Sequence, residues 1–154
     1  MNNLEKNTLP RRLLALATVC LLLLASACSM NDEPAPLTPE QSAALEKRVT
    51  ERWHFMEEKD FSNVYTYASP NYRRIFSKSM YLNKFSYSVD WELTGVDILN
   101  YDAQAAVASV AVRVMSKPTK QTSSASIAMG ALPVTLHEQW MLVDDEWWHS
   151  TKVK

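Results

Sequence analysis

The first extended pattern of apolar and polar residues in the chain has the period of an α-helix. Apolar side chains recur every three or four residues, while charged residues fill most positions between them. The apolar set is Leu45, Val49, Trp53 and Met56. Thr38 can cap this helix, Pro39 suits its first position, and Gln41 can complete a capping box with Thr38. The pattern therefore predicts a helix that begins at Pro39 and buries one face.

Three shorter helical segments are predicted before the chain changes character. They cover residues 60–68, 69–76 and 79–85. The middle segment has a clear start, because Ser69 is a good N-cap residue and Pro70 fits the first helical position. Helices therefore precede every predicted strand.

From residue 90 onward the apolar positions follow the shorter period of β-strands. The expected strands are 91–99, 104–115, a segment within 127–143, and 146–152. Gly95 is expected at a bulge, because the alternation slips there. Turns are expected at 100–102 and 144–145, and the polar stretch 116–126 is expected to be flexible. Helices followed by an antiparallel meander predict an α+β fold, in which N-terminal helices pack on a curved antiparallel sheet.

An apolar run precedes the folded part of the chain. Lys6, Arg11 and Arg12 come before an uncharged segment, residues 13–27. This segment is shorter than the roughly 20 apolar residues of a membrane-spanning helix. A positive start followed by an apolar stretch and small residues is typical of a secretory signal. Residues 1–27 are therefore predicted to be a signal peptide.

The end of this run, Leu24-Ala25-Ser26-Ala27-Cys28, resembles the lipobox of bacterial lipoproteins. The resemblance implies cleavage between Ala27 and Cys28, and attachment of diacylglycerol, with palmitate or a similar acyl chain, to Cys28. Ala25 departs from the branched aliphatic residue that usually stands at its position. The alternative is an ordinary secretory signal followed by a chance cysteine. Two or three acyl chains would anchor the protein stably, because a single chain binds only marginally.

The lipidated segment, residues 28–37, is predicted to be a tether for one domain, residues 38–154. Fully extended, the tether spans roughly 30 Å, so the domain is expected to stay near the membrane. Ser29 occupies the place where Asp is the best-known inner-membrane retention signal. In a host with two membranes, the expected location is the outer membrane, facing the periplasm. Cys20 is lost with the signal, so the mature domain is expected to have neither a disulfide nor a free thiol.

Composition excludes several classes of function. Of 16 basic and 17 acidic residues, the signal peptide removes three and one, which leaves 13 and 16 and a net charge of −3. Nucleic-acid binding is not expected, because no basic stripe is present. Two glycines are too few for a glycine-rich phosphate loop. The three histidines lack metal-ligand spacing, so neither a metal nor another cofactor is expected. Arg73 and Arg74 are expected on a solvated face.

Three segments resemble the NTF2-like superfamily, which is also called SnoaL-like or ketosteroid-isomerase-like. They are EKDFSNVYTYASPNYR, GVDILNYDAQAAVASVAV and EQWMLVDDEWWHS. Many members close with Glu-x-Trp-x-Leu-x-Asp-Gly-x-Trp, and the matching residues here are Glu138, Trp140, Leu142, Asp144 and Trp147. Asp145 replaces the turn glycine, which Asp tolerates because it can enter the left-handed region. The resemblance covers residues 39–152 and implies a cone formed by helices and a curved sheet.

Enzymes of this superfamily work in a pocket between the sheet and the helices. A two-residue final turn would pair Trp140 with His149 and Leu142 with Trp147, and would put Glu138 diagonally from His149. Glu138, Trp140, Trp147 and His149 therefore form the candidate pocket, in which Glu138 and His149 could be an acid–base couple. The alternative is that the tryptophans are sheet core and that His149 is exposed near the chain end.

Trp147 and Trp148 should point to opposite faces of the last strand, because side chains alternate along a strand. If Trp147 faces the helices, Trp148 lies on the outer face with Met141. Met141 and Trp148 are then a candidate interface for a homodimer or for another envelope protein. The alternative is that residues 116–126 cover this surface.

Three functions are open on the sequence alone. The preferred one is a membrane-anchored lipoprotein with a non-catalytic domain that binds a protein partner or a small apolar ligand at the cell envelope. The first alternative is a small acid–base enzyme, such as an isomerase, dehydratase or hydrolase, that uses a pocket in the cone. The second is a scaffold component of an envelope assembly. No residue pattern of the catalytic members carries over, so no catalytic residue is assigned.

Overall fold

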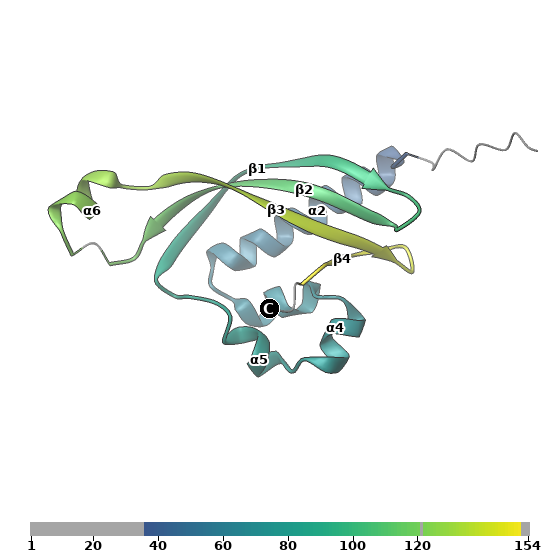
Figure 1. Cartoon of the computed structure of the whole chain (residues 1–154), viewed down its shortest axis with the longest axis horizontal. Helices are drawn as coiled ribbons and strands as arrows, with labels where there is room; N and C mark the ends of the chain where they lie inside the picture. The colour runs from purple at the N-terminus through teal and green to yellow at the C-terminus, as the bar shows by residue number, and fades with distance from the viewer. Residues whose placement is uncertain (1–35, 121, 152–154) are drawn as a thin grey trace, which may run out of the picture. The chain divides into compact units, whose positions relative to one another are not determined.

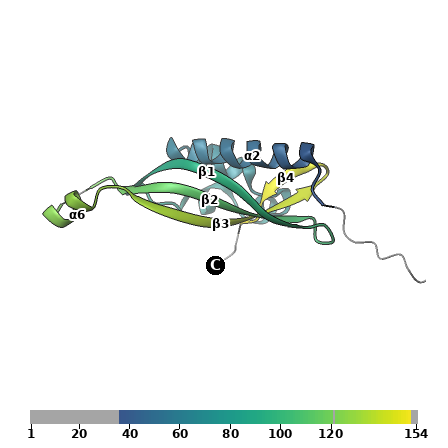
Figure 2. The same cartoon turned by 90° about the horizontal axis from the view of Figure 1, so that it is seen from above.

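The main helices of the domain lie on one side of a curved sheet (Figures 1 and 2). This computed structural model describes residues 36–120 and 122–151. The predicted signal peptide, its cleavage site at Ala27 and Cys28, and most of the predicted tether lie outside the described residues. Helices come first and a four-stranded antiparallel sheet follows. The predicted α+β class, with N-terminal helices packed on a curved antiparallel sheet, is confirmed.

Helix α2 (Pro39–Glu57) begins where the sequence predicts it. The Gln41 backbone N–H donates to the Thr38 hydroxyl at 3.2 Å, and the Thr38 N–H donates to Gln41 Oε1 at 3.1 Å. These two bonds complete the capping box. The buried face carries the four predicted apolar side chains and one charged residue, Arg52. Burial of each large apolar side chain stabilises the fold by about 1.5–3 kcal/mol.

Four short helices connect α2 to the sheet. They are α3 (Phe61–Val64), η2 (Tyr65–Tyr67), α4 (Pro70–Ile75) and α5 (Lys78–Leu82). Asp60, Ser69 and Ser77 cap α3, α4 and α5, because each side chain accepts a backbone N–H of the first turn. The Ser77 cap starts α5 one residue earlier than predicted. Tyr72 and Tyr81 join α4 to α5 through an edge-to-face contact with ring centroids 6.0 Å apart.

The sheet is an antiparallel meander in the order β1-β2-β3-β4. Its strands are β1 (Val89–Asp102), β2 (Val107–Pro118), β3 (Leu132–Val143) and β4 (Glu146–His149). The register of β1 against β2 shifts between Leu93 and Gly95, so the predicted bulge is confirmed. A Cβ atom on residue 95 would meet the Arg113 guanidinium, the end of a flexible side chain that would have to move aside.

The turn predicted at 100–102 is wrong. Strand β1 continues to Asp102, and the connection to β2 lies at 103–106. Asp102 Oδ1 accepts the backbone N–H groups two and three residues later, each at 3.0 Å, and Ala106 has a left-handed φ of 52°. The Asp102 side chain thus organises the turn from the end of β1, and β2 begins three residues later than predicted.

The expectation that 116–126 is a flexible stretch is wrong at both its ends. Strand β2 extends through Pro118, and α6 (Ser124–Met129) forms before β3 begins. Gly130 follows α6 with a φ of 62°, the left-handed backbone that glycine adopts readily after a helix. Both views place α6 at the end of the sheet that is far from β4 (Figures 1 and 2).

The core lies between the helices and the inner face of the sheet. Its largest fully buried side chains come from α2, α3, α5 and β3, and they are Trp53, Phe61, Tyr81 and Trp140. Strand β2 adds Val110, Val112 and Val114, each at most 1% exposed. Large aromatic side chains from the helices therefore cluster with side chains of the sheet in one hydrophobic core.

Candidate functional site

The β3–β4 hairpin holds most of the residues that the sequence singles out. Its turn is Asp144-Asp145, and both residues are left-handed, with φ of 52° and 60°. Two successive left-handed residues are typical of the tight turn whose twist matches antiparallel strands. The predicted register is confirmed, because Trp140 pairs with His149 and Leu142 pairs with Trp147. The turn chemistry alone was enough to predict these pairs.

Glu138 is the centre of a buried polar cluster. Its Oε1 accepts a hydrogen bond from Arg52 Nη1 at 2.8 Å and one from the Trp53 indole N–H at 3.0 Å. Its Oε2 accepts the Trp140 indole N–H at 3.0 Å. The carboxylate is 8% exposed, so these bonds are shielded from water. Glu138 therefore connects β3 to α2 through charge-assisted hydrogen bonds, which are the stronger class.

Arg52 is the functional residue that the sequence interpretation missed. Its side chain is 6% exposed and forms an ion pair with Glu138. The helical period could have revealed it, because position 52 lies three residues after Val49 and four before Met56 on the buried face. A buried carboxylate on the sheet also requires a cation or several donors. Within the described part of the chain, Arg52 Nε has no hydrogen-bond partner.

His149 lies beside this cluster without being hydrogen-bonded to it. Its Nε2 is 4.0 Å from Glu138 Oε1, which exceeds a hydrogen-bond distance, and its Nδ1 is 3.3 Å from the Thr151 hydroxyl. The ring packs edge-to-face with Trp140, at a centroid distance of 5.5 Å. Burial, together with the positive charge of Arg52, holds the pKa of His149 well below its ordinary value of 6.5. The ring is therefore neutral at pH 7.

Tyr81 of α5 extends the cluster to the short helices. The side chain is 2% exposed, and burial raises the pKa of its phenol, although the nearby Arg52 charge acts in the opposite direction. Arg52 thus influences ionisable groups on both α5 and β4. The cluster draws its members from α2, α5, β3 and β4.

Trp147 lies apart from the other candidate pocket residues. It is 2% exposed, and its indole N–H donates to the Gln41 carbonyl at 3.1 Å. Its ring packs edge-to-face with Tyr101 at a centroid distance of 5.9 Å. The structure therefore brings Glu138, Trp140 and His149 together, while Trp147 fastens β4 to the first turn of α2.

Trp148 and Met141 are cross-strand partners, as the predicted alternation requires. Trp148 is only half-buried, and two guanidinium groups approach its ring. The Cζ atoms of Arg48 and Arg73 each lie 5.0 Å from its centroid, a distance at which the cation attracts the ring. Residues 116–126 do not cover it, because β2 and α6 carry that stretch to the far end of the sheet (Figure 1). The interface remains a prediction.

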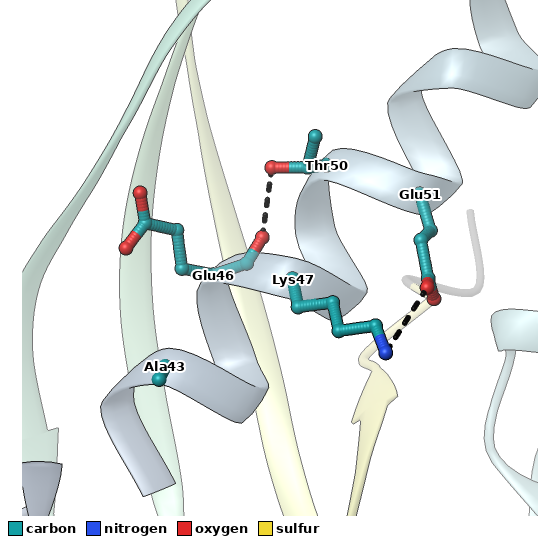
Figure 3. Close-up of a pocket in the computed structure, with 5 residues that line it drawn as sticks. All are labelled: Ala43, Glu46, Lys47, Thr50 and Glu51. Atoms are coloured by element: carbon teal, nitrogen blue, oxygen red, sulfur yellow. Dashed lines mark hydrogen bonds and ion pairs between the residues drawn. The ribbon is translucent and has the colours of Figure 1, made fainter. Parts of the chain in front are cut away.

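A shallow hollow lies on the outer side of α2, away from the buried cluster (Figure 3). Its lining is Ala43, Glu46, Lys47, Thr50 and Glu51. Thr50 donates to the Glu46 carbonyl at 2.8 Å, and Lys47 lies 3.9 Å from Glu51. These local contacts satisfy the polar groups of the helix surface, so the hollow is not a convergent binding site.

A second hollow lies over the strands, where Ser109 of β2, His137 and Gln139 of β3 and Leu99 of β1 contribute to the lining. His137 and Gln139 alternate with the buried Glu138 and Trp140, so they occupy the opposite face of the sheet. This hollow therefore opens on the face of the sheet opposite the buried cluster, and Glu138 itself also contributes to its lining.

Compared with known proteins, the chain matches no family model and no curated protein sequence. Among residues 36–120 and 122–151, no three or more His, Cys, Asp or Glu side chains are grouped to hold a metal ion. In the same residues, no helix is long and apolar enough to cross a membrane.

Proposed function

We propose that the chain is a membrane-anchored lipoprotein whose NTF2-like domain is a non-catalytic module that binds a protein partner at the cell envelope. The observation that carries the non-catalytic part is the use of Glu138. Both of its oxygens accept hydrogen bonds, and all three donors belong to the fold itself. Glu138, the acid–base candidate, therefore links α2 to β3 through these hydrogen bonds.

Catalysis by the Glu138–His149 pair would require access to a substrate proton. A general base must come within hydrogen-bond reach of the proton that it removes. Glu138 is 8% exposed and His149 is 14% exposed, and the rings of Trp53 and Trp140 are packed against the carboxylate. These contacts support a structural role for the pair.

The aromatic residues of the core also favour a protein partner over a small apolar ligand inside the cone. A ligand pocket of ordinary size is a cleft or cavity of about 300–1,000 Å³ lined mainly by apolar groups. The indole N–H groups of Trp53 and Trp140, whose rings would line such a cavity here, donate instead to the Glu138 carboxylate. Binding at the outer surface, to another envelope protein or to a second copy, is consistent with this packing.

The membrane anchor is the first part of the proposal to test, and Cys28 carries it. Cys28→Ser is expected to release the protein from membranes or to leave the signal uncleaved. The matched control is Cys20→Ser, which changes the other cysteine inside the predicted signal and should leave attachment intact. Fractionation and the mass of the N-terminal peptide measure both outcomes. Normal cleavage and membrane attachment of Cys28→Ser would contradict the anchor.

The binding module is tested on protein extracted from its own membrane. Native mass spectrometry is expected to detect the lipidated chain together with a second polypeptide, either another protein or a second copy. Retention of a small molecule with no second polypeptide would contradict the protein-partner proposal. Fractionation of the two membranes, where the host has both, tests the expected outer-membrane location.

The competing function is an acid–base enzyme, and one observation favours it. His149 is neutral and sits 4.0 Å from a carboxylate, so a small displacement of β4 could bring the two into hydrogen-bond contact. A ligand that enters this site should perturb the His149 ring resonances in an NMR titration. Failure of a panel of small carbonyl compounds to shift those resonances would favour the non-catalytic proposal.

A further inference from the structure

The segment from Phe61 to Val89 has an unusual charge distribution. It contains Arg73, Arg74, Lys78 and Lys84 and not a single Asp or Glu. The other described residues contain seven Lys and Arg against fourteen Asp and Glu. A second stretch without Asp or Glu, residues 103–137, carries Arg113, Lys117 and Lys120. The part that includes α4 and α5 is therefore one of two regions of the described chain in which basic residues are in excess.

The four basic side chains of this segment are also unneutralised. Within the described residues, no carboxylate lies within 4.0 Å of any of them. Five of the seven basic residues elsewhere form ion pairs, and they are Lys47, Arg48, Arg52, Lys59 and Arg113. The Arg73 guanidinium lies over the Trp148 ring, and Lys84 Nζ donates to the Tyr72 hydroxyl at 2.8 Å. The exposed charges available to an anionic partner are therefore those of Arg74 and Lys78.

Exposed apolar side chains accompany these charges. Ile75 at the end of α4 is 71% exposed, and Met80 in α5 is 53% exposed. Arg74 directly precedes Ile75, and Lys78 lies between Ile75 and Met80 in the chain. Both basic side chains are exposed. Figure 1 shows α4 and α5 next to each other at the edge of the domain, and the Tyr72–Tyr81 ring contact joins the two helices. We call Arg74, Ile75, Lys78 and Met80 the α4–α5 patch.

We propose that the α4–α5 patch docks on an anionic lipid surface. Basic side chains attract acidic headgroups, and the exposed apolar side chains can enter the boundary between headgroups and acyl chains. The Asp and Glu residues elsewhere in the domain are repelled by the same surface, which favours an orientation with α4 and α5 toward the lipid. An acidic protein could satisfy the charges, but paired basic and aliphatic residues on a projecting helical corner fit a bilayer better.

The proposal adds an orientation to the proposed lipoprotein, yet its test does not use the lipid anchor. Pro34–Lys154 is a compact unit that contains the complete hydrophobic core, from Leu45 to Trp147. This unit lacks Cys28. A negative result in vesicle binding therefore concerns the patch alone, while Cys28→Ser tests the anchor separately.

The experiment measures sedimentation of residues 34–154 with vesicles. Binding is expected with phosphatidylcholine vesicles that contain about 30 mol% phosphatidylglycerol, and not with phosphatidylcholine alone. Each basic residue near an anionic surface contributes about 1 kcal/mol, so Arg74→Gln with Lys78→Gln should weaken partitioning about 30-fold. Ile75→Ser with Met80→Ser should weaken it about tenfold. Added salt should weaken wild-type binding, because it screens exposed charges.

The matched control is Lys47→Gln with Lys117→Gln, which removes two exposed charges outside the patch. It should change partitioning less than about threefold. Circular dichroism and thermal midpoints confirm that each variant is folded. Equal loss in the control and patch variants, or failure of the wild type to bind anionic vesicles, would overturn the proposal. If the domain is retained on immobilised polyglutamate but does not bind vesicles, the partner of the α4–α5 patch is an acidic protein and not a lipid surface.

Discussion

Arg52 and Arg74 differ in the burial of their positive charge and in the groups that surround it. Arg52 is 6% exposed and is neutralised by Glu138, which also accepts two indole N–H groups. Arg74 is exposed, and its described hydrogen bond goes to the neutral Asn71 side chain at 2.7 Å. The interior charge of Arg52 is paired with a carboxylate on the sheet, whereas Arg74 has no carboxylate within 4.0 Å among the described residues. Burial and pairing of charge thus distinguish the two arginines.

The largest expected effect is a loss of stability when the Glu138 carboxylate is removed from the buried cluster. Glu138→Ala leaves the Arg52 charge and two indole N–H groups buried without an acceptor. Breaking one partner of a buried ion pair typically costs about 3–5 kcal/mol. The free energy of unfolding of residues 34–154, measured by urea denaturation, is expected to fall by about that amount.

Two variants control for this effect. Gln139→Ala changes the next residue, on the opposite and exposed face of β3, and should cost less than about 0.5 kcal/mol. Arg52→Met combined with Glu138→Leu replaces the pair by apolar side chains and should recover the part of the loss that comes from the unpaired Arg52 charge. The two indole N–H groups still lack an acceptor in this variant. A loss below about 1 kcal/mol in Glu138→Ala would mean that the cluster does not hold the fold.

The next effect is a dependence of stability on pH through His149. Its folded pKa lies below the ordinary value of 6.5, so the unfolded state takes up a proton more readily. Stability is therefore fully present above pH 6.5 and falls as the pH decreases below 6.5. The slope for one such group is at most about 1.4 kcal/mol per pH unit. Urea titrations between about pH 5 and 7 measure it.

His149→Gln is expected to remove this part of the pH dependence, because glutamine does not titrate. His54→Gln is the control, since the His54 side chain is 65% exposed on α2. The control should retain the slope of the wild type. An unchanged slope in His149→Gln would show that the buried ring does not couple folding to pH.

The smallest expected effect is on stability when the α4–α5 patch is changed. Arg74→Gln with Lys78→Gln should alter the free energy of unfolding by less than about 0.5 kcal/mol, because neither side chain is paired with a carboxylate among the described residues. Urea denaturation measures this directly. A loss of more than about 1 kcal/mol in the free energy of unfolding would mean that these two charges stabilise the fold. They would then not differ from Arg52 in this respect.

Local chemistry explains what the sequence predicts well. The start of α2 follows from Thr38, Pro39 and Gln41, which are adjacent in the chain and complete the cap by themselves. The pairing of Trp140 with His149 follows from a two-residue turn and the alternation of strands. In both cases the determining residues lie within a few positions of the element that they specify.

Longer-range contacts explain what the sequence interpretation misses. Arg52 and Glu138 are 86 residues apart in the chain, so neither position indicates the other until the sheet is folded over α2. The sequence interpretation places a turn at residues 100–102. The turn instead follows Asp102, because the side chain of this residue accepts the Gln104 backbone N–H. Trp147 and Trp140 share a predicted face but have different partners, because the Trp140 indole donates to Glu138 and the Trp147 indole donates to the Gln41 carbonyl.

The bond from the Trp147 indole to the Gln41 carbonyl joins positions 106 residues apart, and it affects when the domain can fold. The helix that opens the domain is fastened by the last strand of the chain. Contacts of such long sequence separation form slowly, because the intervening chain must be closed into a loop first. During synthesis, α2 has no β4 to pack against until residues 146–149 have been made. The arrangement therefore delays native closure of the domain until β4 is available.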